Sequence, residues 1–402
     1  MKERLKAPEL RFPGFTDDWE ERKLGDTETH FTDGNYGESY PSAKDMSDKA
    51  NGIPFLRGSD FSNGYLDSSN ANYIKPEKHA ELTSGHIKQD DIVLAVRGSL
   101  GTLGYATKEN EGWNINSQLA ILRTNKSEIS GMFLIQYLLG SKGQKEIFSR
   151  NTGTALKQLP IKQLKDIPVP VPTLLEQQKI GSFFKKLDDT IDLHQRKLDL
   201  LKEQKKGYLQ KMFPKNGSKV PELRFAGFAD DWEERKLGEI SKTTIGEFVI
   251  KTKQSDESPY PVYNGGRSYT GKYDEYNNDG PKIVISARGA NAGFVNYVSG
   301  RYWAGNSCYS VSVTKEDEFS IGYLYQFIKY NQVLFTAYQQ AANIPSVSKS
   351  DVEKFSIKYP TVLEQKKIES FFKQLDNTIT LHQFKLDLLK EQKKGFLQKM
   401  FV

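Results

Sequence analysis

The chain repeats itself, and this repetition limits the possible folds more than any other feature of the sequence. Residues 8–26 and 221–239 differ at three of nineteen positions, and residues 175–213 and 363–401 are identical at 32 of 39 positions. Matches of this length do not arise by chance. The 402 residues therefore form two related halves, each with a shared lead, a divergent region and a shared C-terminal segment.

The spacing between the copies shows where the halves differ. The lead copies are 213 residues apart (221 − 8) and the C-terminal copies 188 (363 − 175), so the second divergent region is 25 residues shorter. A weaker correspondence survives inside it. VRGSLGTLG at 96–104 resembles ARGANAGFV at 287–295, and Trp113–Ser117 resembles Trp303–Ser307. We expect two related domains that share a frame and present different side chains.

The repeated C-terminal segment predicts a long helix. From Ile180 onward apolar residues recur in alternating steps of four and three, the 3.5-residue period of a coiled-coil seam, and no proline interrupts the pattern before Pro214. About 34 residues at 1.5 Å each give a rod roughly 50 Å long. We expect the two helices to pair antiparallel through the seam residues Phe184, Leu187, Ile191, Leu198, Leu201, Phe372, Leu375, Ile379, Leu386 and Leu389.

Packing of each helix on its own domain alone is the alternative, and a single copy would favour it. Two near-identical seams favour pairing. His194 and His382 occupy matching seam positions, where a polar residue sets the register more often than it binds a metal. Lys205 and Lys393 are expected to extend their ammonium groups to solvent near the end of the seam.

The divergent regions are typical of mixed α/β domains. Strand-like runs at 92–96, 119–122, 282–285 and 309–313 alternate with turns, and helical stretches follow at 131–139 and 321–328. Several loops combine arginine, amide and glycine residues, which can contact base edges and phosphates. For any one loop, ordinary turn chemistry is the alternative. The candidate DNA-binding residues are Arg57, Ser59, Arg97, Ser99, Asn116, Asn264, Arg267, Lys272, Arg288, Asn291 and Asn306.

Composition excludes several other classes of protein. The single cysteine, Cys308, cannot form an intramolecular disulfide, no apolar run is long enough to span a membrane, and no secretory signal is visible, so we expect a cytoplasmic protein. The net charge of +6 is only mildly basic. The phosphate-loop, HExxH and nucleophile-elbow motifs are missing, as is the Asn-Pro-Pro-aromatic signature of amino-methyltransferases. We therefore expect no catalytic residue and no metal site.

Four sequence motifs complete the pattern. Pro172–Ile180 and Pro360–Ile368 each join a proline-containing exit to a helix that begins E-Q-x-K-I. Ile53–Asp60 reads IPFLRGSD, and Asp90–Leu94 leads to two glycines, Gly98 and Gly101. With these motifs the whole chain resembles the specificity (S) subunits of type I restriction–modification systems. The second domain departs from IPFLRGSD and has YPVYNGG at residues 260–266.

The resemblance implies an α+β fold with a pseudo-two-fold internal repeat. Target recognition domains would occupy residues 1–172 and 214–360, including the leads, and conserved helices would occupy 173–213 and 361–402. Each domain would bind one half of a bipartite double-stranded DNA target, while the helices set the spacer and dock two methyltransferase (M) subunits. Motor–nuclease (R) subunits would join the complex. S-adenosylmethionine, ATP and Mg²⁺ would bind to these partners and not to this chain. A free-standing DNA enzyme and a pure scaffold protein are the rival classes.

Overall fold

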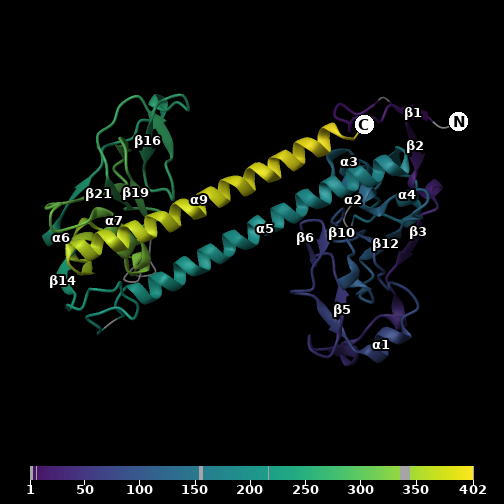
Figure 1. The fold of residues 1–402 in the computed structure, drawn as a ribbon, viewed down its shortest axis with the longest axis horizontal. Coiled ribbons are helices and arrows are strands. Elements are labelled where there is room, and N and C mark those ends of the chain that lie inside the picture. The colour runs from purple at the N-terminus through teal and green to yellow at the C-terminus, as the bar shows by residue number, and fades with distance from the viewer. Residues whose placement is uncertain (1–2, 6, 154–156, 216, 336–344, 402) are drawn as a thin grey trace. The chain divides into compact units, whose positions relative to one another are not determined.

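The computed structural model describes residues 3–5, 7–153, 157–215, 217–335 and 345–401. The chain forms two compact units, the first from residues 1–195 and 384–402 and the second from residues 196–383. The repeated segments are long helices, α5 (Leu174–Met212) and α9 (Val362–Lys399), shown in teal and yellow in Figure 1. Each unit therefore contains one divergent region, one end of α5 and one end of α9.

The first unit is built on a six-stranded sheet around the buried strand β9. Its order is β3 (His30–Asp33), β12 (Leu119–Arg123), β9 (Ile92–Ala95), β10 (Leu103–Tyr105), β7 (Tyr65–Leu66) and β6 (Phe61–Ser62). A second sheet has the order β11 (Asn114–Ile115), β5 (Ile53–Leu56), β8 (Asn72–Ile74) and β4 (Met46–Ser47). A third joins β1 (Glu3–Leu5), β2 (Trp19–Lys23) and β13 (Pro168–Val171). The helices are α1 (Pro76–Glu81), α2 (Gly131–Leu139), α3 (Ser141–Ser149) and α4 (Ile161–Lys165).

The second unit repeats this plan with fewer strands. Its main sheet has the order β15 (Ser241–Ile245), β21 (Cys308–Val313), β18 (Lys282–Ser286) and β19 (Val295–Val298). Smaller sheets join β17 (Gly271–Tyr273), β16 (Tyr260–Tyr263) and β20 (Trp303–Ala304), and β14 (Glu233–Lys236) with β22 (Ser356–Tyr359). The helices are α6 (Leu237–Ile240), α7 (Ile321–Tyr330) and α8 (Lys349–Lys354). The prediction of two related mixed α/β domains is confirmed.

The core of each unit is completed by the helix that belongs to the other repeat. In the first unit Phe401, just beyond α9, stacks on Phe184 of α5 with ring centroids 6.2 Å apart, and lies 5.4 Å from Phe133. In the second unit Phe213, just beyond α5, stacks on Phe372 of α9 at 6.0 Å. These rings are buried. Neither divergent region therefore has a complete core without the far end of the other repeat's helix.

The repeated leads are fastened to the start of the helices by buried ion pairs. The guanidinium of Arg11 donates to both carboxylate oxygens of Glu176, at 2.7 and 2.8 Å, and Glu176 is fully buried. Arg224 binds Glu364 in the same two-pronged way, at 2.8 Å twice. A buried carboxylate requires such a partner because loss of hydration is costly. This explains why arginine and glutamate appear in both copies of the repeat.

Within each unit α5 and α9 run antiparallel, as predicted. In the first unit contacts run from Phe183–Phe396 to Asp188–Lys393, so the chain numbers rise on one helix as they fall on the other. In the second unit they run from Lys202–Gln383 to Tyr208–Phe371. The prediction that the ten seam residues contact one another is not met at the outer ends of the seam. There Phe184 stacks on Phe401 and Phe372 stacks on Phe213, two residues outside the predicted set.

Most predicted seam residues are buried, and the others are half-buried. The buried residues are Phe184, Ile191, Leu198, Leu201, Phe372 and Leu386. The half-buried ones are Leu187, Leu375, Ile379 and Leu389. The seam is therefore the sequestered face of both helices.

Truncating a buried seam residue should destabilise the protein. Leu198 is 1% exposed, so Leu198→Ala is expected to lower the free energy of unfolding by about 2–5 kcal/mol through lost burial and a cavity. Urea denaturation measures this quantity. Leu193, 66% exposed on the same helix, is the matched control, and Leu193→Ala should change stability by less than about 0.5 kcal/mol. Equal effects of the two variants would contradict the assignment of the seam.

Candidate nucleic-acid interface

Two predicted loops of the first unit lie against each other. One follows β5 and holds Arg57 and Ser59, and the other follows β9 and holds Arg97 and Ser99. A β-carbon added to Gly58 would lie 3.3 Å from the Cβ of Ser99, so the loops are in close contact and glycine keeps the space between them open. Ser59, Arg97 and Ser99 are exposed there.

Arg57 is engaged by a buried carboxylate of its own loop. Its guanidinium donates to both oxygens of Asp60 at 3.2 Å and to the backbone oxygen of Asn70 at 2.6 Å. The Arg57 amide and the Ser59 hydroxyl donate to the same carboxylate at 2.8 and 3.0 Å. Because the Asp60 side chain is only 1% exposed, these bonds offset its loss of hydration. Arg57 and Ser59 thus shape the loop, and their contact with DNA stays a prediction.

Arg97 is held on the surface by three groups. Its guanidinium donates to the side-chain oxygen of Gln158 at 3.1 Å, to the Tyr36 hydroxyl at 3.3 Å and to the backbone oxygen of Ser117 at 3.4 Å. It also lies 5.3 Å from the centre of the Tyr36 ring. These contacts orient an exposed arginine without burying it.

The second unit places a different set of side chains on the same frame. Pro54 and Pro261 are the second residues of the equivalent strands β5 and β16, so Arg57 corresponds to Asn264 and Asp60 to Arg267. The side-chain oxygen of Asn264 accepts a hydrogen bond from the backbone amide of Ser307 at 3.1 Å. Asn264 therefore stabilises the structure of its own loop.

Two further candidates of this unit also contact each other. Arg267 is exposed and donates to the half-buried Asn291 at 3.3 Å. This pair joins the loop after β16 to the loop after β18. The ammonium of half-buried Lys272, on β17, donates to the backbone oxygen of Asp256 at 2.9 Å.

Arg288 is the structural counterpart of Arg97. Each follows the central strand of its main sheet, and each forms a backbone bridge, Arg97 with Gln158 and Arg288 with Ser346. Arg288 is exposed. The correspondence of the two Arg-Gly steps predicted from sequence therefore holds in three dimensions.

The asparagines Asn116 and Asn306 are not counterparts, although the sequence alignment paired them. Asn114 pairs with Phe55, and Trp303 pairs with Val262, the residue equivalent to Phe55. The alignment is thus shifted by one residue. Asn116 is buried and accepts the backbone amide of Gln118 at 2.9 Å, whereas Asn306 is exposed.

Lys329, which sequence reasoning missed, adds a cation beside Arg267. It lies on α7, and its ammonium donates to the backbone oxygen of Val295 at 2.7 Å and lies 3.6 Å from the ring centre of Phe294. Arg267 lies 5.9 Å from the same ring. Burial lowers the pKa of Lys329 to about 8, and the nearby cations Lys205 and Arg267 add to this effect. The sequence feature that could have indicated this residue is the single lysine in the otherwise largely apolar helix α7.

An ion pair links the helices in each unit, and its carboxylate is buried in the first unit and half-buried in the second. Lys393 contacts Asp188 at 2.6 Å in the first unit, and Lys205 contacts Asp376 at 2.5 Å in the second. The prediction that these lysines extend to solvent is wrong, because each finds a carboxylate on the opposite helix. Burial raises the pKa of Asp188, while Lys393 and Gln136 oppose this rise.

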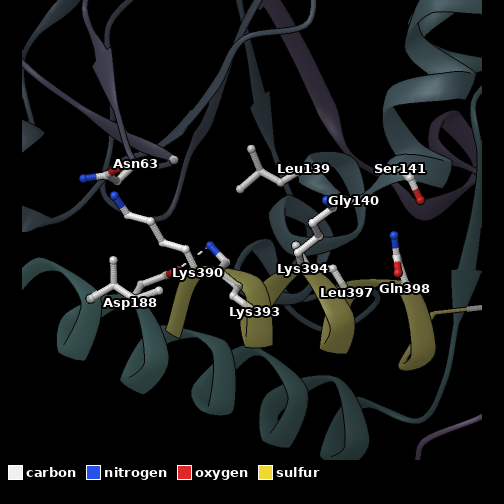
Figure 2. A pocket seen from close by; sticks show the side chains of 12 residues that line it. Asn63, Leu139, Gly140, Ser141, Asp188, Lys390, Lys393, Lys394, Leu397 and Gln398 are labelled. Carbon is white, nitrogen blue, oxygen red and sulfur yellow. Dashed lines mark ion pairs between the residues drawn. The ribbon is translucent and has the colours of Figure 1, made fainter. Parts of the chain in front are cut away.

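The ion pair between Lys393 and Asp188 lines a pocket of about 470 Å³ in the first unit. Figure 2 shows Lys390, Lys393 and Lys394 projecting from α9 toward it, Lys393 to Asp188, Lys390 to Asn63 and Lys394 to Gly140. His194 and His382 are half-buried on the helices.

Within the described ranges, no three His, Cys, Asp or Glu side chains are grouped so as to hold a metal ion. No described helix is long and apolar enough to cross a membrane.

Comparison with known proteins identifies related chains. A family model described as the type I restriction modification DNA specificity domain matches residues 16–203 and 229–391. The type I restriction enzyme MjaX specificity subunit of Methanocaldococcus jannaschii is 26% identical, over 95% of this chain and 92% of that protein. A type I specificity subunit of Mycoplasma genitalium is 21% identical, over 82% and 88%. The crystal structure of a type I S subunit from M. genitalium has the same fold, with a TM-score of 0.76, 17% identity and 99% of both chains covered.

The contacts of Arg57 and Arg97 predict that only Arg57 contributes substantially to stability. Arg57→Ala should lower the free energy of unfolding by about 1–3 kcal/mol, because Asp60 would stay buried without its cation. Arg97→Ala removes an exposed side chain and should change it by less than about 0.5 kcal/mol. Urea denaturation of both variants tests this. A loss at Arg97 as large as that at Arg57 would identify Arg97 as a structural residue.

Proposed function

The chain belongs to the family of type I restriction modification DNA specificity domains, and on this basis we propose that it is the sequence-specific DNA-binding subunit of a type I restriction–modification complex. The observation that carries the proposal is the repeated frame with divergent loops. Both units present an exposed arginine after the central strand, Arg97 in one and Arg288 in the other, while the surrounding loop residues differ. One frame with two sets of side chains suits a target with two different halves.

The two long helices would set the spacing between the half-sites. Helix α5 has 39 residues, which corresponds to a length of about 58 Å. One turn of duplex DNA is about 34–36 Å. Helices of this length leave room for a stretch of DNA that neither domain contacts.

Exposed leucines at matching positions of α5 and α9 support docking of methyltransferase subunits. Leu193 is 66% exposed and its counterpart Leu381 is 64% exposed. Leu200 and Leu388 repeat the match at 52% and 47%. Large apolar side chains exposed at the same place in two copies indicate two equivalent protein interfaces. We assign one M subunit to each.

The chain itself would be non-catalytic and cytoplasmic. S-adenosylmethionine would bind to the M subunits, and ATP and Mg²⁺ to the motor–nuclease subunits that complete the complex. The purified chain should therefore neither methylate nor cleave DNA when these compounds are supplied. A free-standing DNA enzyme would show turnover, and a scaffold protein would show no sequence preference.

A domain exchange tests whether the two halves are independent. Residues 240–358 are replaced by the equivalent domain of a related subunit, and the chimera is assembled with its M subunits. Sequencing of the methylated sites should show one half-site changed and the other intact, because the first unit's loops are untouched. A simultaneous change of both half-sites would contradict independent binding.

Substitutions at the exposed leucines test the docking surface. Leu193→Asp and Leu381→Asp should each remove one M subunit from the complex, because a charge cannot be buried in an apolar interface without a partner. Native mass spectrometry measures the composition. Val333→Asp, at an apolar residue of similar exposure (66%) outside α5 and α9, is the control. Full complexes with both leucine variants would place the interface elsewhere.

A further inference from the structure

An aromatic residue occupies the same structural position after the edge strand of the main sheet in each unit, β3 in the first and β15 in the second. The amide of Gly34 donates to the backbone oxygen of Leu119, and that of Gly246 to the backbone oxygen of Cys308, at corresponding points of the main sheets. Each glycine also packs against the backbone of the neighbouring short strand, where a β-carbon would come within 2.2 Å of an oxygen. Tyr36 and Phe248 follow these glycines by two residues, so they are counterparts.

Tyr36 contacts Arg97 through both its hydroxyl and its ring. Its hydroxyl donates to the backbone oxygen of Ser117 at 3.1 Å and accepts from the guanidinium at 3.3 Å. The side chain is 43% exposed. The ring and the hydroxyl together restrict the orientation of the arginine that the first unit presents.

Phe248 has no hydroxyl and is far more exposed, at 72%. Its loop is nevertheless fastened on both sides. The Glu247 amide donates to the backbone oxygen of Ala304 at 2.8 Å, and the Tyr273 hydroxyl donates to the backbone oxygen of Ile250 at 2.8 Å. A phenyl ring is thus held out into solvent by an ordered loop.

The surroundings of Phe248 identify the chemistry of its partner. Lys251 and Lys253 follow on the same loop and are exposed. On the other side, a β-carbon at Gly305 would lie 2.3 Å from the Asn264 side-chain oxygen and 2.7 Å from Val249, so this loop adjoins the loops of Asn264 and Asn306. An apolar ring among cations and amides matches a nucleic acid, which combines phosphates with apolar base faces and thymine methyl groups.

We propose that these matched aromatics determine sequence specificity: Phe248 contacts a base of the second unit's half-site directly, and Tyr36 positions Arg97 for the first unit's half-site. The inference rests on the proposed function, since it assumes that the two units bind DNA. It explains why the same position carries a hydroxyl in one unit and none in the other. Tyr36 acts through a guanidinium, whereas Phe248 acts through its ring.

Binding to defined duplexes tests the role of Phe248. The complex with M subunits is titrated with its own target, with duplexes changed in one half-site, and with unrelated DNA. Phe248→Ala should weaken binding to the target about tenfold, the loss expected for a base contact, and should leave binding to unrelated DNA unchanged. Val333→Ala is the matched control and should bind like wild type.

The outcomes separate the inference from the proposed function. An equal loss on all DNA would show that Phe248 acts on phosphates or on folding, and unchanged binding would show that it contacts no base. Either result overturns the inference while target preference of the wild-type complex persists. Failure of the wild-type complex to prefer any sequence would overturn the proposed function itself.

A double-mutant cycle tests the positioning role of Tyr36. Tyr36→Phe removes only the hydroxyl and should relax preference within one half-site. In the Arg97→Ala background it should have no further effect, because the group that it positions is missing. Additive losses in the cycle would overturn the positioning role. Melting temperatures of the single variants should match wild type, which excludes a folding defect as the cause.

Discussion

The burial of Phe401 and Phe213 is the interaction on which the rest of the structure depends. Each ring follows the last residue of one repeat's helix and packs into the core of the other repeat's divergent region. Phe401 stacks there on Phe184, and Phe213 stacks on Phe372. A buried aromatic side chain contributes several kcal/mol to stability. Since each half supplies the missing part of the other's core, folding of either region is coupled to antiparallel pairing of the helices.

Ion pairs between the helices then define the register of this pairing. Asp188 with Lys393 and Asp376 with Lys205 join the two helices at equivalent points, and Arg11 with Glu176 fastens a lead to a helix start. Asp188 is buried, and a buried charge without its partner is strongly destabilising, so a slipped register that separates Asp188 from Lys393 is disfavoured. The apolar seam alone would discriminate less sharply between registers, because one leucine can replace another along it.

The loops differ between the two units, although the strands that carry them are arranged in the same way. Asp60 in the first unit and Arg267 in the second occupy equivalent positions after β5 and β16, with opposite charges. Asp60 is buried and holds Arg57, whereas Arg267 is exposed and contacts Asn291. The strands beneath tolerate this exchange because their own hydrogen bonds and apolar cores carry the fold. Different target sequences can therefore be served by the same architecture.

The sequence by itself determined the two-fold repetition, the main strands, the long helices and their sequestered face. These features follow from local periodicity and from identity between copies, which require no knowledge of distant contacts. The tertiary structure alone decided that Arg57 is held by buried Asp60, that Asn116 is not the counterpart of Asn306, and that Lys205 and Lys393 find carboxylates. Each of these outcomes depends on which distant groups meet, and sheet register and burial set that, while the residue types alone leave it open.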